Sequence, residues 1–324
     1  MSGDASPGSH RHSRPGRVVV GGEALVDLVP AHDGTLAPRL GGGPFNVAVA
    51  LGRLGVPSTF LSRLSTDAFG EALLARLRES GVDASLVQRG PQPTTLAVVE
   101  LAPDGSASYG FYTEGTADRL VADPGPLPGD VAAVCLGTLS LVLEPGASVY
   151  EAVLHREAAA GRLTVLDPNV RAALIPDAAA YRARLHSWLA SVGLLKLSVE
   201  DAGWLAAGLD VGLDVERALQ CWLDAGPAAV VLTRGGDGLS VRTAGTRVDV
   251  ATPAVAVADA IGAGDTVAAA LLGRLHDRGA LDRDSLTALD ADGWRDVLGF
   301  AARAAAVTVS RAGADPPWRH ELGH

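Results

Sequence analysis

The 324-residue sequence contains a single lysine, Lys196, and only two cysteines, Cys135 and Cys221. Both cysteines have apolar neighbours and neither has the spacing of a metal site, so we expect reduced thiols in the core of a cytoplasmic protein. No uninterrupted apolar run reaches the roughly eighteen residues that a helix needs to cross a bilayer. These absences argue against a disulfide-rich secreted domain and against a membrane protein.

Basic residues are also few. The sequence has 27 lysines and arginines against 37 aspartates and glutamates, which gives a net charge of −10. This balance argues against a nucleic-acid-binding surface and against binding to an anionic membrane. A bound polyphosphate would have to be neutralised by a few cationic side chains, by backbone N–H groups and by a metal ion.

Several common catalytic motifs are missing. The one lysine is followed by leucine, so the sequence has no P-loop. The glycine run at 41–46 lacks the sixth-position glycine of a dinucleotide-binding fingerprint, which removes the main support for a Rossmann dehydrogenase. The sequence also lacks the Gly-x-Ser-x-Gly turn of α/β-hydrolases.

The pattern of apolar segments predicts an α/β protein. A buried strand is expected at 17–22, and a helix is expected after the glycines at 41–43, with Gly55 at its end. Short apolar strands are then predicted at 132–136, 163–166, 194–197 and 229–232. Helix-length segments lie near 147–160, 178–190, 199–207, 215–225 and 294–310. This alternation predicts a parallel sheet that is covered by helices.

Two further regions stand apart from this alternation. Residues 95–101 and 106–112 read as strands around the turn Ala102-Pro103-Asp104-Gly105, and with 23–40 they could form a small β lid drawn from about 23–40 and 93–115. Residues 1–16 contain no hydrophobic stretch, so we expect a disordered tail and no secretory signal. Residues 17–318 then form one domain, followed by a short tail at 319–324.

The segment from Asp259 to Thr266 places Gly262-Ala263-Gly264 directly before a helix expected from Thr266 to Leu275. Helix N-termini have unpaired N–H donors and partial positive charge, so this turn can bind a phosphate or a transferring phosphoryl group. Asp265 stands beside that site, where its carboxylate could accept a proton. The alternative is that Asp265 simply caps the helix. Asp259 adds a second carboxylate, next to the apolar, strand-like run 254–258.

Two glycine-rich segments together resemble the two signatures of the PfkB (ribokinase-like) carbohydrate kinases. The first is Gly41-Gly42-Gly43-Pro44-Phe45-Asn46 with its following helix to Gly55, and the second is residues 259–266. Segments between them match in order: 22–27, 167–171, 196–201 and 233–238. The resemblance covers about residues 17–318 and is strongest to the fructokinase branch. It implies a three-layer α/β/α domain with a mainly parallel central sheet and a small β-sheet lid.

The resemblance implies an ATP-dependent sugar kinase with a specific set of site residues. Asp265 would be the general base, and Gly262, Ala263 and Gly264 would form the anion hole. The sugar site would contain Asp27, Gly42, Gly43, Asn46, Phe111 and Arg171. Phe111 and its neighbour Tyr112 could cover the sugar, or they could belong to the lid core or to a dimer contact.

Nucleotide and metal sites are implied in the same way. The nucleotide site would contain Lys196, Ser198, Thr233, Gly235 and Gly238; Lys196 could instead be a salt-bridged strand end. Asn169 and Asp201 resemble indirect Mg²⁺ positions, although Asp201 stands where the family commonly has Glu. Asp259 resembles the side-chain ligand of a K⁺ site, with carbonyls from Ile261, Thr308, Arg311 and Gly313. Pro317 stands where some members provide a serine hydroxyl.

The sequence defines the sugar that accepts the phosphoryl group less well than it defines the type of reaction. Thr113 stands where acid-sugar kinases of the family often have an arginine, which favours a neutral sugar such as fructose. Ribose, a nucleoside or 2-keto-3-deoxygluconate remain alternative acceptors, as does a catalytically silent sugar-binding protein. Exposed edges of the lid favour a homodimer formed through the lid.

Overall fold

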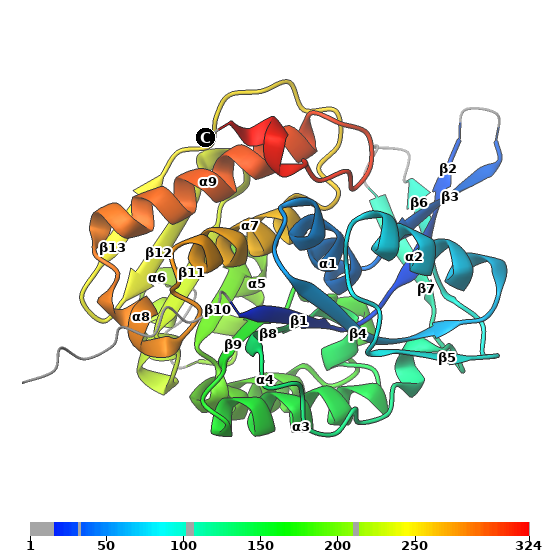
Figure 1. Cartoon of the computed structure of the whole chain (residues 1–324), viewed down its shortest axis with the longest axis horizontal. Helices are drawn as coiled ribbons and strands as arrows, with labels where there is room; N and C mark the ends of the chain where they lie inside the picture. The colour runs from blue at the N-terminus through cyan, green and yellow to red at the C-terminus, as the bar shows by residue number, and fades with distance from the viewer. Residues whose placement is uncertain (1–15, 32–33, 102–106, 210–213, 324) are drawn as a thin grey trace, which may run out of the picture.

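The computed structural model describes residues 16–31, 34–101, 107–209 and 214–323. The predicted tail, apart from Gly16, and the predicted hairpin turn at 102–105 lie outside these residues. A central sheet and a smaller second sheet, with helices on both faces of the larger one, make up the fold (Figure 1). The predicted α/β class, with its mainly parallel sheet and β lid, is confirmed.

The central sheet has the strand order β13-β12-β11-β10-β9-β8-β1-β4-β5. Neighbours from β11 to β5 pair in parallel, and β12 and β13 add an antiparallel edge. The strands are β1 (Arg17–Gly21), β4 (Ser58–Ser65), β5 (Val87–Gly90), β8 (Val131–Gly137), β9 (Leu163–Asp167), β10 (Leu194–Ser198), β11 (Ala229–Thr233), β12 (Leu239–Thr243) and β13 (Arg247–Val250).

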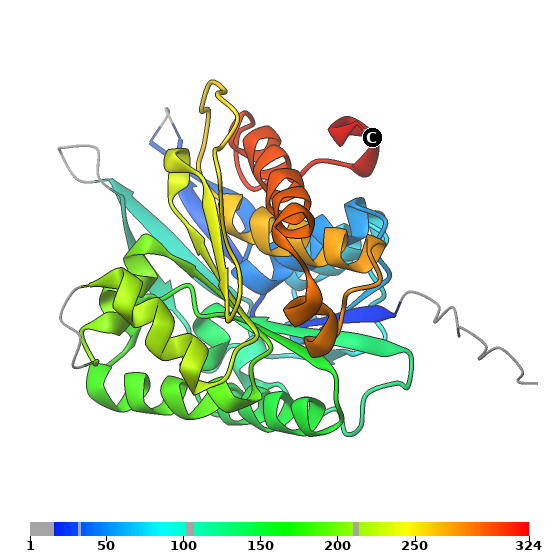
Figure 2. The same cartoon turned by 90° about the vertical axis from the view of Figure 1, so that its left-hand side faces the viewer.

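The parallel strands carry apolar side chains on both faces of the sheet, so helices cover both faces. In β1, Val18 and Val20 belong to one core and Val19 to the other. The first core packs against α1 (Gly43–Arg53), α2 (Ala68–Glu79), α7 (Ala263–Asp277), α8 (Arg283–Ala288) and α9 (Ala291–Val309). The second packs against α3 (Gly146–Ala159), α4 (Ala178–Trp188), α5 (Val199–Ala206) and α6 (Val215–Ala225) (Figure 2).

The lid is a four-stranded sheet in the order β3-β2-β6-β7. Its strands are β2 (Leu25–Pro30), β3 (Leu36–Gly41), β6 (Thr95–Leu101) and β7 (Ala107–Tyr112). It lies at the right of the domain in Figure 1, beside α2. Two carboxylates fasten the start of β6 to the body, because Asp67 accepts from Thr94 at 2.7 Å and Asp118 accepts from Thr95 at 2.5 Å.

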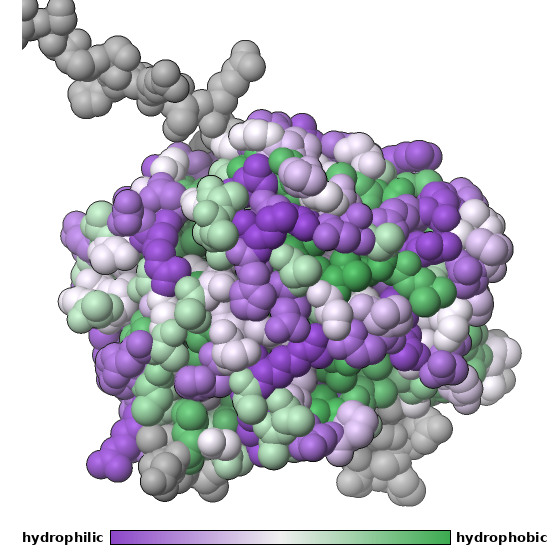
Figure 3. Space-filling view, turned by 90° about the horizontal axis from the view of Figure 1, so that it is seen from below, coloured by the Kyte–Doolittle hydropathy of each residue, from purple (hydrophilic) through white to green (hydrophobic). Residues whose placement is uncertain are grey.

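The surface below the sheet is formed by α3 and α4, and polar and apolar residues are interspersed on it (Figure 3). In the described part of the chain, no helix combines the length and the apolar character needed to cross a bilayer. Both cysteines are free, as expected, but only Cys135 is buried; Cys221, on α6, is partly buried, so its placement in the core was wrong.

The strand-like run at 254–258 does not form a strand. Residues 251–262 contain no strand, and the apolar run 254–258 lies exposed at the surface. The N–H groups of Ala258 and Asp259 both donate to the Val309 carbonyl at the end of α9. The apolar pattern was therefore misleading, because this segment crosses the end of a helix and does not enter the sheet.

Candidate active site

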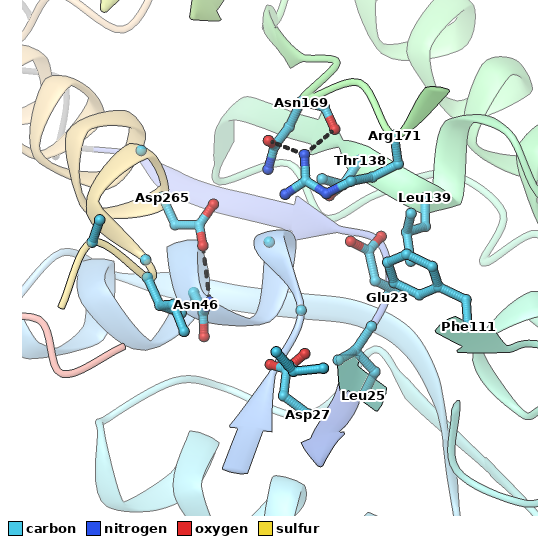
Figure 4. Close-up of a pocket in the computed structure, with 17 residues that line it drawn as sticks. Glu23, Leu25, Asp27, Asn46, Phe111, Thr138, Leu139, Asn169, Arg171 and Asp265 are labelled. Carbon is cyan, nitrogen blue, oxygen red and sulfur yellow. Dashed lines mark hydrogen bonds between the residues drawn. The ribbon is translucent and has the colours of Figure 1, made fainter. Parts of the chain in front are cut away.

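A cavity of about 370 Å³ lies between the lid and the carboxyl ends of the parallel strands (Figure 4). Open α/β sheets commonly bind ligands at this edge, because the loops that follow neighbouring strands converge there. Eleven of the predicted site residues line the cavity: Asp27, Gly42, Gly43, Asn46, Phe111, Asn169, Arg171, Ile261, Gly262, Gly264 and Asp265. The structure thus brings together residues from opposite ends of the sequence.

The loop before α7 has the geometry of an anion site, although its helix begins earlier than expected. Gly262 is the N-cap in the left-handed conformation (φ 75°), and α7 starts at Ala263 and not at Thr266. A β-carbon on Gly262 would lie 2.7 Å from that of Ala314, so only glycine fits. The Ala263 N–H donates to Ala260 O at 3.3 Å. Gly264 and Asp265, the next two residues of the first turn, provide the N–H donors that have no intrahelical acceptor.

Asp265 lies in this first turn and does not cap the helix, which rejects the alternative interpretation. It is 8% exposed, and its Oδ2 accepts a 2.8 Å hydrogen bond from Asn46 Nδ2. Burial raises the pKa of Asp265 to about 6, against the opposing effects of the Asn46 bond, Lys196 and Arg171. A carboxylate with this pKa is ionised at neutral pH and is a stronger base than an exposed aspartate.

Asn46 reaches Asp265 because α1 begins at the cavity. Its N-cap, Gly42, has a φ of 108°, and a β-carbon there would lie 2.8 Å from the Glu23 carbonyl. The first turn of α1 therefore approaches the β1–β2 connection closely and directs the Asn46 side chain into the site. This is the physical reason for Gly42 in the first motif.

Asp27 and Arg171 face the cavity from opposite sides (Figure 4). Burial raises the pKa of Asp27 to about 6, and Arg171 acts in the other direction. Arg171 Nη1 donates to Asn169 Oδ1 at 2.7 Å and to Asn169 O at 3.0 Å. Asn169 itself has a φ of 40°, which turns the chain after β9 back toward the site. Of the two predicted lid aromatics, Phe111 lines the cavity, whereas Tyr112 is 66% exposed.

A buried ion pair lies behind the loop formed by residues 259–265, which we call the anion loop. Lys196 Nζ is 2.7 Å from Asp167 Oδ2, and both side chains are more than nine-tenths buried. The ammonium approaches the loop closely, since a β-carbon on Gly264 would lie 3.1 Å from Nζ and could be accommodated only if the lysine side chain shifted. Burial raises the pKa of Asp167 to about 6, and Lys196 opposes this shift. Lys196 does not line the cavity. Its ion pair with Asp167 agrees with the alternative interpretation from the sequence, in which Lys196 is a salt-bridged strand end.

The remaining nucleotide and magnesium candidates lie at the ends of β10 and β11 or just after them, and they do not line the cavity. Ser198 and Asp201 form a capping box at the start of α5. Asp201 also accepts the Val170 N–H at 2.7 Å, so it ties α5 to the loop after β9. Thr233 ends β11, and Gly235 and Gly238 bound the next turn with φ values of 53° and 104°.

The potassium candidates lie on two adjacent loops. Asp259 Oδ1 accepts the Ile261 N–H at 3.0 Å, and Asp259 Oδ2 accepts the Gly313 N–H at 2.9 Å. The Thr308 carbonyl accepts the Arg311 N–H at 3.1 Å. Asp259 thus joins the anion loop to the turn after α9. No group of three or more His, Cys, Asp or Glu side chains that could hold a metal was found in the described ranges.

Sequence reasoning missed several residues that line the cavity: Glu23, Leu25, Val99, Thr138, Leu139 and Ala260. Glu23 and Thr138 closely follow the ends of β1 and β8. Their position after parallel strands was the available signal, because those ends meet at the ligand-binding edge. The lid residues gave no such signal, since their strands face the cavity only after the lid has formed.

Three comparisons place the chain among known proteins. The model of the pfkB family of carbohydrate kinases matches residues 16–321. A fructokinase from Rhizobium leguminosarum bv. trifolii is 40% identical over 282 residues, covering 85% of this chain and 84% of that protein.

Two solved structures share the fold over nearly their whole length. Fructokinase from Xylella fastidiosa with bound ATP has a TM-score of 0.87 and 27% identity, covering 95% of this chain and 98% of that one. A double mutant of fructokinase from Vibrio cholerae O395, in a fructose-, ADP- and potassium-bound form, has a TM-score of 0.81 and 27% identity, covering 94% and 95%.

Proposed function

The chain belongs to the pfkB family of carbohydrate kinases and is an ATP-dependent carbohydrate kinase, and we propose that its acceptor is fructose. The observation that carries the proposal is the position of Asp265. Its carboxylate lies beside free N–H groups at a helix start and lines a cavity that also contains other polar groups. This arrangement pairs a base for a hydroxyl proton with a site for phosphoryl charge. The similarity to known fructokinases supports the choice of sugar.

In the proposed reaction, a fructose hydroxyl oxygen attacks the γ-phosphorus of ATP while Asp265 accepts the hydroxyl proton. The bond from the γ-phosphorus to the bridging oxygen breaks, and the electron pair leaves with ADP. Phosphoryl transfer depends mainly on alignment and charge stabilisation. The N–H groups of the turn at 262–265 would stabilise the charge on the transferring group.

The sugar would lie between Asp27, Asn46 and the amides of Gly42 and Gly43, with Phe111 from the lid over it. Carboxylate and amide groups can together accept and donate several hydroxyl hydrogen bonds. Among the described residues that line the cavity, three carboxyl groups (Glu23, Asp27 and Asp265) face one guanidinium, that of Arg171. This excess of acidic groups favours a neutral acceptor over a sugar acid or a sugar phosphate.

ATP would occupy the edge beyond the anion loop, where Ser198, Thr233, Gly235 and Gly238 lie. Val199, next to Ser198, is 38% exposed. The segment that begins at Thr252, which donates to the Gly235 carbonyl at 3.2 Å, carries Val255 and Val257, which are 42% and 68% exposed. These side chains would provide apolar surface for a base. The Lys196 ammonium supports the site from behind Gly264.

Magnesium carried by ATP would neutralise phosphate charge. Both Asp201 oxygens already accept backbone N–H bonds, and Asn169 Oδ1 accepts from Arg171. Carboxylate and amide oxygens keep further lone pairs, so these residues fit a water-mediated contact. The Asp167 Oδ1 atom is buried and has no hydrogen-bond partner in the described residues, which offers the ion's hydration shell another acceptor.

We also propose a potassium site at Asp259, with carbonyls from Ile261, Thr308, Arg311 and Gly313. Asp259 already bonds to the two loops that would hold the ion, and the related Vibrio cholerae structure contains potassium. A homodimer through the lid is proposed as well, because β3 and β7 are its edge strands and carry the exposed Leu36 and Tyr112. We place the enzyme in the cytoplasm, where ATP is available.

A substrate panel tests the proposed function. Purified protein would be incubated with ATP and Mg²⁺ and with fructose, ribose, adenosine or 2-keto-3-deoxygluconate, and ADP release would be measured. We expect the highest kcat/KM with fructose. A higher value with another acceptor would overturn the assignment of fructose, and sugar binding without ADP release across the panel would overturn the assignment of a kinase.

A further inference from the structure

Glu23 is a buried carboxyl group in the cavity that the mechanism above does not use. It lies in the short connection between β1 and β2, is 3% exposed and lines the same cavity as Asp27 and Asp265. Its carboxyl end points into the cavity on the side of Arg171 and Phe111 (Figure 4). A group this buried would lose its hydration on folding, so its position requires partners.

The protein supplies some of these partners but does not use the full capacity of the group. Glu23 Oε2 accepts the Ser140 hydroxyl at 2.5 Å and the Ser140 N–H at 3.1 Å, and the Thr138 hydroxyl is a further donor. A carboxylate has about four lone-pair sites, so at least one remains. These bonds also fix the orientation of the group before a ligand arrives, which reduces the entropy lost on binding.

The protonation state of Glu23 adds a second way to bind a hydroxyl group. Burial, with a smaller effect from Asp118, raises the pKa of Glu23. A protonated carboxyl group would donate one hydrogen bond and still accept others. Both forms match a sugar hydroxyl, which is itself donor and acceptor.

We propose that Glu23 is an acceptor-binding residue, whose carboxyl group forms a direct hydrogen bond with one hydroxyl group of the sugar. This inference rests on the proposed function and extends its sugar site beyond Asp27 and Asn46. It also supports the proposal of a neutral acceptor, because an anionic group next to Glu23 would face a buried carboxyl. The competing explanation is that Glu23 only holds the Thr138–Leu141 turn through Ser140.

The test compares Glu23→Gln with Ser140→Ala. The glutamine keeps the shape and one acceptor oxygen for Ser140 but changes the hydrogen-bonding pattern toward the cavity. Ser140 does not line the cavity, and its alanine variant removes the hydroxyl bond to Glu23 but keeps the 3.1 Å bond from the Ser140 N–H, which still orients the carboxyl group. KM and kcat for fructose, KM for ATP and the melting temperature would be measured for both.

For Glu23→Gln we expect KM for fructose to rise by about tenfold or more, with KM for ATP changed by less than about twofold. Ser140→Ala should lower the melting temperature and leave KM for fructose within about threefold of the wild type. An unchanged KM for fructose in Glu23→Gln, or equal effects of the two variants on both substrates, would overturn the proposal.

Monodeoxyfructoses provide the direct readout. If Glu23 contacts one hydroxyl group, the analogue that lacks this group should have a much lower kcat/KM than fructose with the wild type. With Glu23→Gln, the kcat/KM of the same analogue should be no more than about twofold below that of fructose. Equal losses for every analogue in both proteins would overturn the contact. Failure of the wild type to phosphorylate fructose would contradict the proposed function instead, and the same cycle would then use deoxy analogues of the acceptor that the panel identifies.

Discussion

Asn46 donates a 2.8 Å hydrogen bond from Nδ2 to Oδ2 of Asp265, across 219 positions of the sequence. The bond connects the first turn of α1 with the first turn of α7, two helices that share one hydrophobic core. It favours the ionised form of Asp265 against the cost of burial. The proposed sugar site and the proposed base are therefore energetically coupled.

Replacing Asp265 with Asn should reduce kcat by about 10² to 10⁴, because the amide cannot accept the hydroxyl proton. The side chains are nearly the same size, so the circular dichroism spectrum should match that of the wild type. Steady-state ADP release measures the effect. Turnover close to the wild-type rate in a folded variant would contradict the role of Asp265 as the base.

The same variant should be more stable than the wild type at neutral pH. The pKa of Asp265 rises from 3.8 to about 6 on folding, so the folded state binds the proton more tightly between these values. The stability contributed by this group is present below pH 3.8 and is lost as the pH rises through 6. The uncharged amide has no such loss, so Asp265→Asn should gain about 1–3 kcal/mol in unfolding free energy at pH 7. Urea denaturation at several pH values from about 5 to 8 measures it; a difference that does not grow as the pH rises through the pKa would contradict the prediction.

The acid limb of kcat/KM should lie near pH 6 and move upward in Asn46→Ala. Below the pKa of Asp265, which is about 6, the base is protonated, and loss of the Asn46 bond raises that pKa further. Rates at saturating ATP between about pH 5 and 8 would locate the limb. Because Asp27 also has a pKa of about 6, Asp27→Asn is the matched control. A limb that disappears in Asp27→Asn, or that stays in place in Asn46→Ala, would assign it to another group.

Much of the fold was predictable because each signal was local. The short apolar strands β8 to β11 and the helices between them agree with their predicted ranges to within about two residues. The exposed run 254–258 was not predictable in this way. Its apolar character is the same as that of a strand, but its last residues bond to the Val309 carbonyl at the end of α9, a partner that no local pattern reveals.

The candidate site was predictable where backbone geometry requires glycine. The glycines at 42 and 262 have positive φ and close neighbours, a backbone geometry that favours glycine, so these residues indicate it in the sequence itself. Glu23 and the Asp167–Lys196 pair were harder to interpret. Their roles depend on burial and on partners that are far away in the sequence, and neither is visible in a local pattern.

Potassium should activate the enzyme through the anion loop. Asp259 bonds to Ile261 and Gly313, so an ion held there would stabilise the loop that ends at Gly262. We expect a higher kcat in KCl than in NaCl at equal ionic strength, and a much smaller difference in Asp259→Asn, which removes the charge. Initial rates across a titration of each salt measure the effect. Equal rates in both salts would contradict the proposed site.

Replacing Lys196 with Met should destabilise the protein by about 3–5 kcal/mol, because it leaves Asp167 buried without its partner. The double variant Asp167→Asn with Lys196→Met removes both charges and should recover most of this stability. Turnover should not recover with it, because the ammonium lies against Gly264 and its charge would support the transferring phosphoryl group. Urea denaturation and kcat, measured on both variants, separate the two effects. Recovery of kcat together with stability would show that Lys196 serves only to pair with Asp167.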